Sequence, residues 1–326
     1  MLLAVVDHDQ GNLNTVSLEM LTLARPVADG LGEPLEAVLI GQVARPLADH
    51  LPAYGVSRVH LVQHAGLDEY APEAWATSIV ELQQALSPAA IVAPGTDRGN
   101  EVLAHVAAIM DLPMAANCTA VHTGGTTYAV TRLRWGGSLL EEANLAGEPK
   151  LFSVAAHTVE ASKVAEGGAV DVKTFKPSLG DKVFRVRLVE REEAVSDKIS
   201  LAEARVVVGG GRGVGSSEGF APLETLADLL GGAVGGSRVV TNLGWRPHAD
   251  QIGQTGTRIA PDLYIACGIS GAIQHMVGCM GSKHILAINT DREAPIMAKA
   301  DYAVIGDLNE ILPALVEAIG DETDNP

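Results

Sequence analysis

The first half of the chain alternates short apolar runs with longer segments that have apolar residues at helical spacing. Runs that are mostly apolar are typical of strands buried on both faces, as in a parallel sheet covered by helices. We therefore expect strands at residues 2–6, 35–40, 57–62 and 89–93. The clearest helical segments are residues 72–87 and 98–111. This alternation of strand and helix predicts an α/β unit.

A further helix is expected between the first two strands. Its apolar face is formed by Leu13, Val16, Met20 and Leu23, which recur at intervals of three and four residues. Pro26 and Gly30 are expected to mark its end, because proline and glycine disfavour a continuing helix.

The pattern changes after residue 113. Residues 119–159 contain shorter runs separated by glycine pairs, which predict added β-structure, partly antiparallel. Residues 160–182 have little periodicity, and residues 183–195 alternate apolar with charged side chains, as an exposed strand would. We expect the first domain to end near residue 195.

A second α/β unit follows from residue 196 to residue 320. It begins with a strand at 204–208, a glycine loop at 209–219 and a helix at 221–231. Further strands are expected at 263–267, 284–288 and 302–305, with helices at 271–279 and 308–319. The polar residues 321–326 are expected to form a disordered tail. The fold class is therefore α/β with two domains.

Charge and cysteine content restrict the function classes. The net charge of −17 gives no overall basic field for nucleic-acid phosphates, although a few local cations can still hold one small anion. No apolar run approaches the length of a membrane span, and the N-terminus lacks the basic region of a signal peptide. Three cysteines without paired spacing predict neither a disulfide framework nor a metal site. We expect a cytoplasmic protein.

The first candidate for chemistry is the loop within residues 206–220, VVVGGGRGVGSSEGF. Glycines let the backbone approach a ligand, and Arg212 can bind a phosphate through two hydrogen bonds. Neither the dinucleotide fingerprint nor the P-loop pattern is present. A flexible surface turn is the alternative.

Other polar residues follow several strands of the second unit. Ser270 and Gly271 precede a helix that carries Gln274 and His275, and Asn289 comes directly after an apolar run. Ligands bind at the carboxyl edge of open parallel sheets, which favours one shared site. The alternative for each residue is a structural role, such as capping a helix or a turn.

Residues 261–278, PDLYIACGISGAIQHMVG, resemble the signature of the electron-transfer flavoprotein α subunit. Further blocks fall in the order that this family has: GGRG at 210–213, SR at 237–238, GQTG at 253–256, AIN-D at 287–291 and ADY…DL at 300–308. The resemblance covers essentially the whole second domain. The first domain agrees in its α/β pattern and general length.

The resemblance implies a Rossmann-like C-terminal domain that holds FAD and a parallel-sheet N-terminal domain similar to the adenine nucleotide hydrolases. The N-terminal domain would pack with a β subunit that carries AMP or a second flavin. Such a heterodimer accepts electrons from acyl-CoA or other flavin dehydrogenases and passes them, through a flavin semiquinone, to a quinone oxidoreductase or another acceptor, as in fatty acid oxidation.

The resemblance also implies residue roles. Arg212 would engage the phosphate or adenosine side of FAD, Arg238 would lie against the isoalloxazine ring, and the Thr255 hydroxyl would lie near ring atom N5. Arg238, Thr255 and His275 would tune the flavin. The complete implied FAD set is Arg212, Ser237, Arg238, Ile252, Gly253, Gln254, Thr255, Ser270, Gly271, Ala272, Ile273, Gln274, His275, Asn289, Asp307 and Leu308.

One stretch departs from the family pattern. Where the family usually reads AAVDAG after the arginine, residues 239–244 read VVTNLG. Two other functions stay open: a regulatory or structural module that holds FAD without passing electrons, and a flavin enzyme with its own substrate. No acid–base pair placed for substrate chemistry is evident, which favours the electron carrier.

Overall fold

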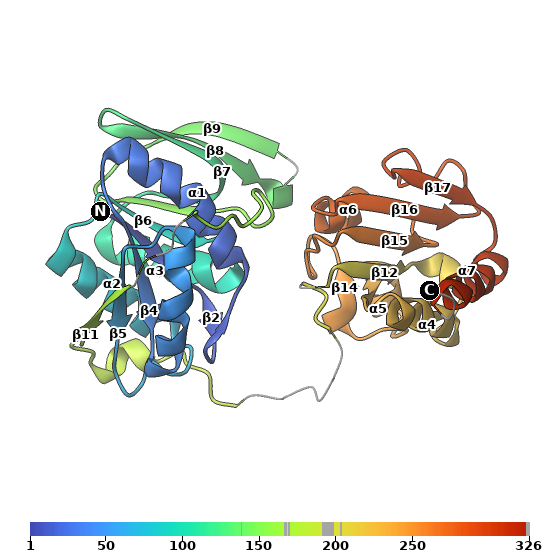
Figure 1. Ribbon diagram of the computed structural model, residues 1–326, viewed down its shortest axis with the longest axis horizontal. Helices are drawn as coiled ribbons and strands as arrows, with labels where there is room; N and C mark the ends of the chain where they lie inside the picture. The colour runs from blue at the N-terminus through green and yellow to red at the C-terminus, as the bar shows by residue number, and fades with distance from the viewer. Residues whose placement is uncertain (138, 166–167, 169, 191–198, 203, 324–326) are drawn as a thin grey trace. The chain divides into compact units, whose positions relative to one another are not determined.

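In the computed structural model, the chain divides into two compact units, residues 1–193 and 194–326 (Figure 1). The structure describes all residues except 138, 166–167, 169, 191–198, 203 and 324–326. The predicted domain boundary at residue 195 lies outside the described residues. Each unit has its own sheet and its own core, as expected for a two-domain α/β chain.

The first unit is built on a nine-stranded sheet with the order β11-β5-β4-β1-β6-β10-β7-β8-β9. Its strands are β1 (Leu2–Val5), β4 (Leu35–Ile40), β5 (Arg58–Val62), β6 (Ala90–Pro94), β7 (Met114–Gly124), β8 (Thr127–Arg134), β9 (Leu139–Leu145), β10 (Lys150–Val154) and β11 (Asp171–Phe175). All pairs from β11 to β7 are parallel, and β8 and β9 add an antiparallel extension. The antiparallel addition predicted for residues 119–159 is therefore confirmed.

The central strands are apolar on both sides because each face is covered. Leu2 and Ala4 of β1 belong to the core on the side of α1 (Val16–Leu31), whereas Leu3 and Val5 belong to the core beneath α2 (Pro72–Leu86) and α3 (Asp97–Met110). The remaining short elements are β2 (His8–Asp9), β3 (Asn12–Leu13), η1 (Gln42–Tyr54), η2 (Trp135–Gly137) and η3 (Asp181–Phe184).

Two local predictions in the first unit are wrong. The first helix passes Pro26, because Val27 and Ala28 beyond the proline are buried in the core, and its last residue is Leu31, one residue past the predicted Gly30. It ends at Gly32, whose φ of 66° suits glycine. No strand forms in the described part of 183–195. The β11 strand takes the sheet edge instead, and Arg185 is paired with Glu73.

The second unit has a six-stranded, wholly parallel sheet with the order β14-β13-β12-β15-β16-β17. Its strands are β12 (Val206–Gly210), β13 (Ala233–Ser237), β14 (Gln251–Ile252), β15 (Leu263–Cys267), β16 (His284–Asn289) and β17 (Tyr302–Ile305). Numbered from one to six along the chain, this order is 3-2-1-4-5-6, the doubly wound order of dinucleotide-binding folds. Its switch point lies between β12 and β15.

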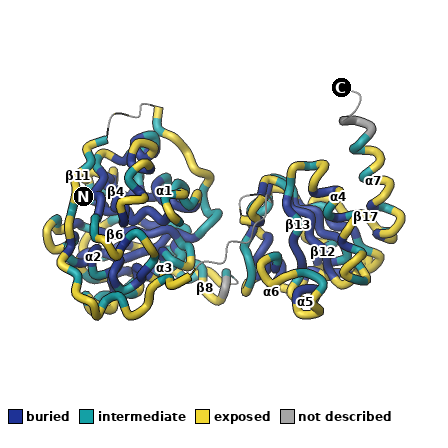
Figure 2. The backbone as a smooth tube through the Cα atoms, turned by 90° about the horizontal axis from the view of Figure 1, so that it is seen from below, coloured by how far each residue is buried: buried dark blue, intermediate teal, exposed yellow. Residues whose placement is uncertain are grey.

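Helices cover both faces of this sheet (Figure 1). They are α4 (Ala221–Leu229), α5 (Arg238–Asn242), α6 (Ile273–Cys279) and α7 (Leu308–Thr323), with short turns η4 (Arg212–Val214), η5 (Glu218–Phe220) and η6 (His248–Asp250). Val207 and Tyr264 belong to the core on the α6 side, and Val208 and Ile265 to the core beneath α4 and α7. Figure 2 shows the buried strands between more exposed helices.

The last helix is longer than expected. It runs to Thr323, past the predicted end at residue 319, so the first residues of the predicted tail are helical. The last three residues of that tail lie outside the described residues. Among the described helices, none is long and apolar enough to cross a membrane.

Candidate functional site

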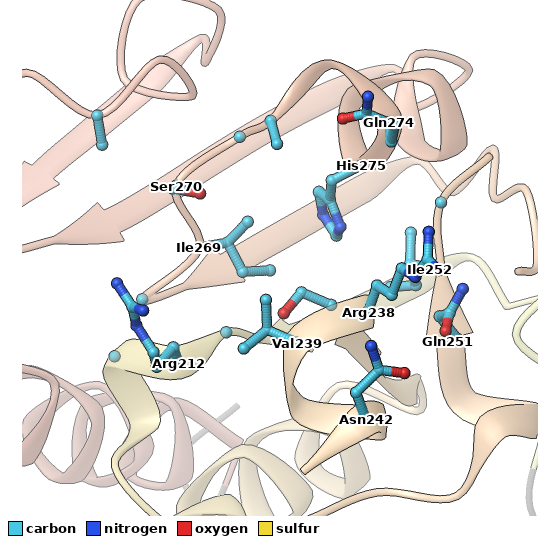
Figure 3. Close-up of a pocket in the computed structure, with 18 of the residues that line it drawn as sticks. Arg212, Arg238, Val239, Asn242, Gln251, Ile252, Ile269, Ser270, Gln274 and His275 are labelled. Carbon is cyan, nitrogen blue, oxygen red and sulfur yellow. The ribbon is translucent and has the colours of Figure 1, made fainter. Parts of the chain in front are cut away.

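A cavity of about 610 Å³ runs along the carboxyl edge of the second sheet (Figure 3). Loops after β12, β13, β14, β15 and β16 all contribute to its lining. The cavity therefore spans the switch point between β12 and β15, which is where ligands bind in open parallel sheets. Its volume falls within the range of small-molecule and cofactor sites.

Thirteen of the sixteen residues of the implied FAD set line this cavity. They are Arg212, Ser237, Arg238, Ile252, Gly253, Gln254, Thr255, Ser270, Gly271, Ala272, Gln274, His275 and Asn289. Ile273, Asp307 and Leu308 do not line it. The Ile273 side chain is exposed, Asp307 accepts a hydrogen bond from the Asn309 backbone N–H at the start of α7, and Leu308 is buried under the sheet.

Nine further lining residues are not in the implied FAD set. They are Gly211, Gly213, Val239, Asn242, Gln251, Gly268, Ile269, Asp291 and Ala294. Most are direct neighbours of predicted residues. Asn242 and Gln251 are different, because α5 and β14, which position them, were not among the expected elements. In the sequence, Gln251 stands two residues before the GQTG block at 253–256.

The two glycine loops at the switch point contact each other through their backbones. The Gly211 N–H donates to the Cys267 carbonyl over 2.8 Å, and the Gly213 N–H donates to the Gly268 carbonyl over 3.1 Å. A Cβ atom at Gly211 would lie 2.2 Å from the Gly268 oxygen. Only glycine fits here, and the cavity floor is therefore main chain that a ligand can approach closely.

Positive charge at the cavity comes from Arg212 and Arg238. Within the described part of the chain, neither guanidinium has an ion-pair or hydrogen-bonding side-chain partner, and both are exposed to the cavity or solvent. Arg246 nearby is different, since it pairs with Glu224 and Asp250. Asp291 is the one acidic residue among the lining residues that are described. The lining thus favours an anionic ligand.

His275 is held in the cavity wall as a neutral ring. Its Nε2 lies 2.8 Å from the hydroxyl of Tyr264, which is wholly buried. Burial lowers the pKa of His275 to about 4 and raises the pKa of Tyr264 well above 10. His275 therefore contributes no charge at neutral pH, and the positive charge of the described lining comes from the two arginines.

The hydroxyl of Tyr264 determines which ring nitrogen of His275 carries the proton. Nε2 of His275 is the only described partner of the Tyr264 O–H, so the hydroxyl donates and the ring carries its own proton on Nδ1. Nδ1 is buried and faces the backbone of Ile252, and this contact partly offsets the lowering of the pKa by burial.

These observations suit a dinucleotide. The glycine floor at the switch point and two arginines without an ion-pair partner among the described residues match the phosphates of such a ligand. In contrast, no group of three or more metal-ligating side chains was found in the described residues.

Comparison with known families gives the same result. Residues 200–280 match the model of the electron transfer flavoprotein FAD-binding domain, and residues 2–179 match that of the electron transfer flavoprotein domain. The chain belongs to the electron transfer flavoprotein α-subunit family. The resemblance noted in residues 261–278 is thereby confirmed, as is FAD as the cofactor of the second domain.

Full-length relatives support this assignment. The chain is 35% identical to the electron transfer flavoprotein subunit alpha of Megasphaera elsdenii, over 97% of this chain and 95% of the relative. It is 38% identical to the subunit of the same name from Mycobacterium leprae, over 97% of both chains. A further relative is the Protein FixB of Clostridium saccharobutylicum, 37% identical over 95% of this chain and 93% of the relative. Electron transfer as an α subunit paired with a β subunit is therefore the role of this family member.

Proposed function

We propose that this chain holds one FAD in the cavity of its second unit and passes electrons from flavin dehydrogenases, such as those acting on acyl-CoA, to a quinone oxidoreductase or another acceptor. The observation that carries the proposal is the site at the switch point, where two unpaired arginines flank a main-chain floor. FAD supplies one-electron chemistry when it is bound.

The chain's own residues bind and tune the cofactor. Arg212, on the loop after β12, binds phosphate, while Arg238, after β13, supplies positive charge to the ring. Positive charge favours added electrons, so Arg238 raises the reduction potential. His275 contributes a neutral hydrogen-bond donor instead of a second cation.

The test uses the αβ complex purified with its β subunit. We expect one FAD in the cavity for each α chain, and rapid flavin reduction by a dehydrogenase that has been reduced with its substrate. The substrate alone, without the dehydrogenase, is the control and should leave the flavin oxidised. Reduction by a small substrate alone would indicate a flavin enzyme. Bound FAD that no dehydrogenase reduces would indicate a regulatory or structural module.

A further inference from the structure

Three side chains form a hydrogen-bonded series that leads from the core of the second unit to the cavity. The Thr241 hydroxyl lies 2.9 Å from Oε1 of Gln251, and Nε2 of Gln251 donates to the Thr255 hydroxyl over 3.0 Å. Thr241 and Gln251 are 4% and 5% exposed, so water does not compete for these bonds. Thr255 is exposed on the cavity lining.

The direction of the series follows from the chemistry of its members. The amide oxygen of Gln251 faces Thr241, so the Thr241 hydroxyl donates and the amide nitrogen points toward Thr255. Because an amide nitrogen only donates, the Thr255 oxygen accepts. The single proton of the Thr255 hydroxyl is then left for a partner in the cavity.

A reversed series is the competing arrangement. Thr241 also lies 3.0 Å from the backbone carbonyl of Arg238 and can donate there instead. Gln251 would then turn its amide nitrogen toward Thr241, and Thr255 would donate to the amide oxygen. In that arrangement, Thr255 offers the cavity only an acceptor. The Thr241 proton therefore decides what Thr255 presents to the ligand.

We propose that Thr241 and Gln251 are positioning residues that make the Thr255 hydroxyl a hydrogen-bond donor to the redox-active ring of the bound flavin. This inference rests on the proposed function. A donor aimed at the ring stabilises the more electron-rich, reduced form, and the series therefore raises the reduction potential. Thr241 lies in the stretch 239–244, VVTNLG, which departs from the usual family sequence.

The test is a double-mutant cycle in the FAD-loaded αβ complex, read out as the first reduction potential. Thr241→Val has the same shape but no hydroxyl, which frees the amide of Gln251 to turn. We expect a three- to tenfold shift of the reduction equilibrium toward oxidised flavin, about 30–60 mV, for a net hydrogen bond of ordinary strength. Thr241→Ser keeps the hydroxyl and should keep the wild-type potential.

A second change, Thr255→Val, distinguishes an effect of Thr241 that acts through Thr255 from a general structural effect of losing the Thr241 hydroxyl. Thr255→Val removes the end of the series, so adding Thr241→Val to it should leave the potential unchanged. Thr225→Val in α4 is the matched control, because it removes a hydroxyl that bonds only to the Ala221 carbonyl of its own helix.

The outcomes distinguish the inference from the proposed function. An unchanged potential in Thr241→Val, or an equal shift in the Thr255→Val background, overturns the inference while the FAD site stands. If the wild-type complex binds no FAD, both the proposed function and the inference are wrong.

Discussion

The buried, neutral His275 makes the second unit less stable in mild acid. The pKa of His275 is about 4 in the folded chain, because burial disfavours the charged ring, and about 6.5 in an unfolded chain. The folded state therefore binds fewer protons than the unfolded state. The stabilisation is fully present above pH 6.5 and is lost as the pH falls from 6.5 toward 4.

The magnitude follows from these two values. Between pH 7 and pH 5, the free energy of unfolding should fall by about 2 kcal/mol on account of this one group. His275→Gln keeps an acceptor for the Tyr264 hydroxyl but does not titrate, so the variant should lack this loss. The difference between the two proteins isolates His275, since all other titrating groups are shared.

The assay is hydrogen–deuterium exchange of peptides from β15 and α6 in flavin-free protein, at pH 7, 6 and 5 and increasing urea. These peptides report the opening of the elements that carry Tyr264 and His275. An equal loss of stability in wild type and His275→Gln would refute the reasoning. A ¹³C-detected His275 ring that titrates near pH 6.5 would refute it as well.

Three further predictions concern the same site. Arg238→Ala should lower the first reduction potential by about 60–120 mV, as expected for losing a hydrogen bond to a charged group, and Arg238→Lys by less, in a redox titration; equal potentials in wild type and Arg238→Ala would contradict its role. Gly211→Ala should lower the free energy of unfolding by about 1–3 kcal/mol, because its Cβ overlaps the backbone of the loop after β15. In the same urea titration, Gly320→Ala should not lower it, because a Cβ there meets no atom outside the nearby backbone of α7 within 4 Å, and alanine favours a helix. Tyr264→Phe should shift the His275 ring proton partly from Nδ1 to Nε2, seen in ¹⁵N chemical shifts, and unchanged shifts would show that the hydroxyl does not set the tautomer.

The strands that the sequence predicted best are those buried on both faces. Mostly apolar runs such as 35–40 are typical of strands buried on both faces. In contrast, the edge strand β11, with the sequence DVKTF, alternates too weakly to be distinguished from a loop. The end of α1 was predicted wrongly because Pro26 is a local signal, and the burial of Val27 outweighs it.

The site could be predicted where a ligand-binding residue follows a strand or lies in a long motif. Arg212 and Ser270 are of this kind, and both line the cavity. Gln251 and Asn242 were not found, because short elements without a periodic pattern bring them to the cavity. Tyr264 also could not be identified, since an apolar strand position gives no indication that its hydroxyl reaches His275.

The sheet order has a consequence for shortened forms of the protein. The region that matches the FAD-binding family model ends at residue 280, yet Asn289, Asp291 and Ala294 of the cavity lie beyond it, after β16. Strand β16 also lies beyond residue 280, and it pairs with the whole length of β15. A fragment that stops at residue 280 would expose one edge of β15 and leave one wall of the cavity open. The smallest autonomous flavin module of this chain must therefore extend at least through Ala294.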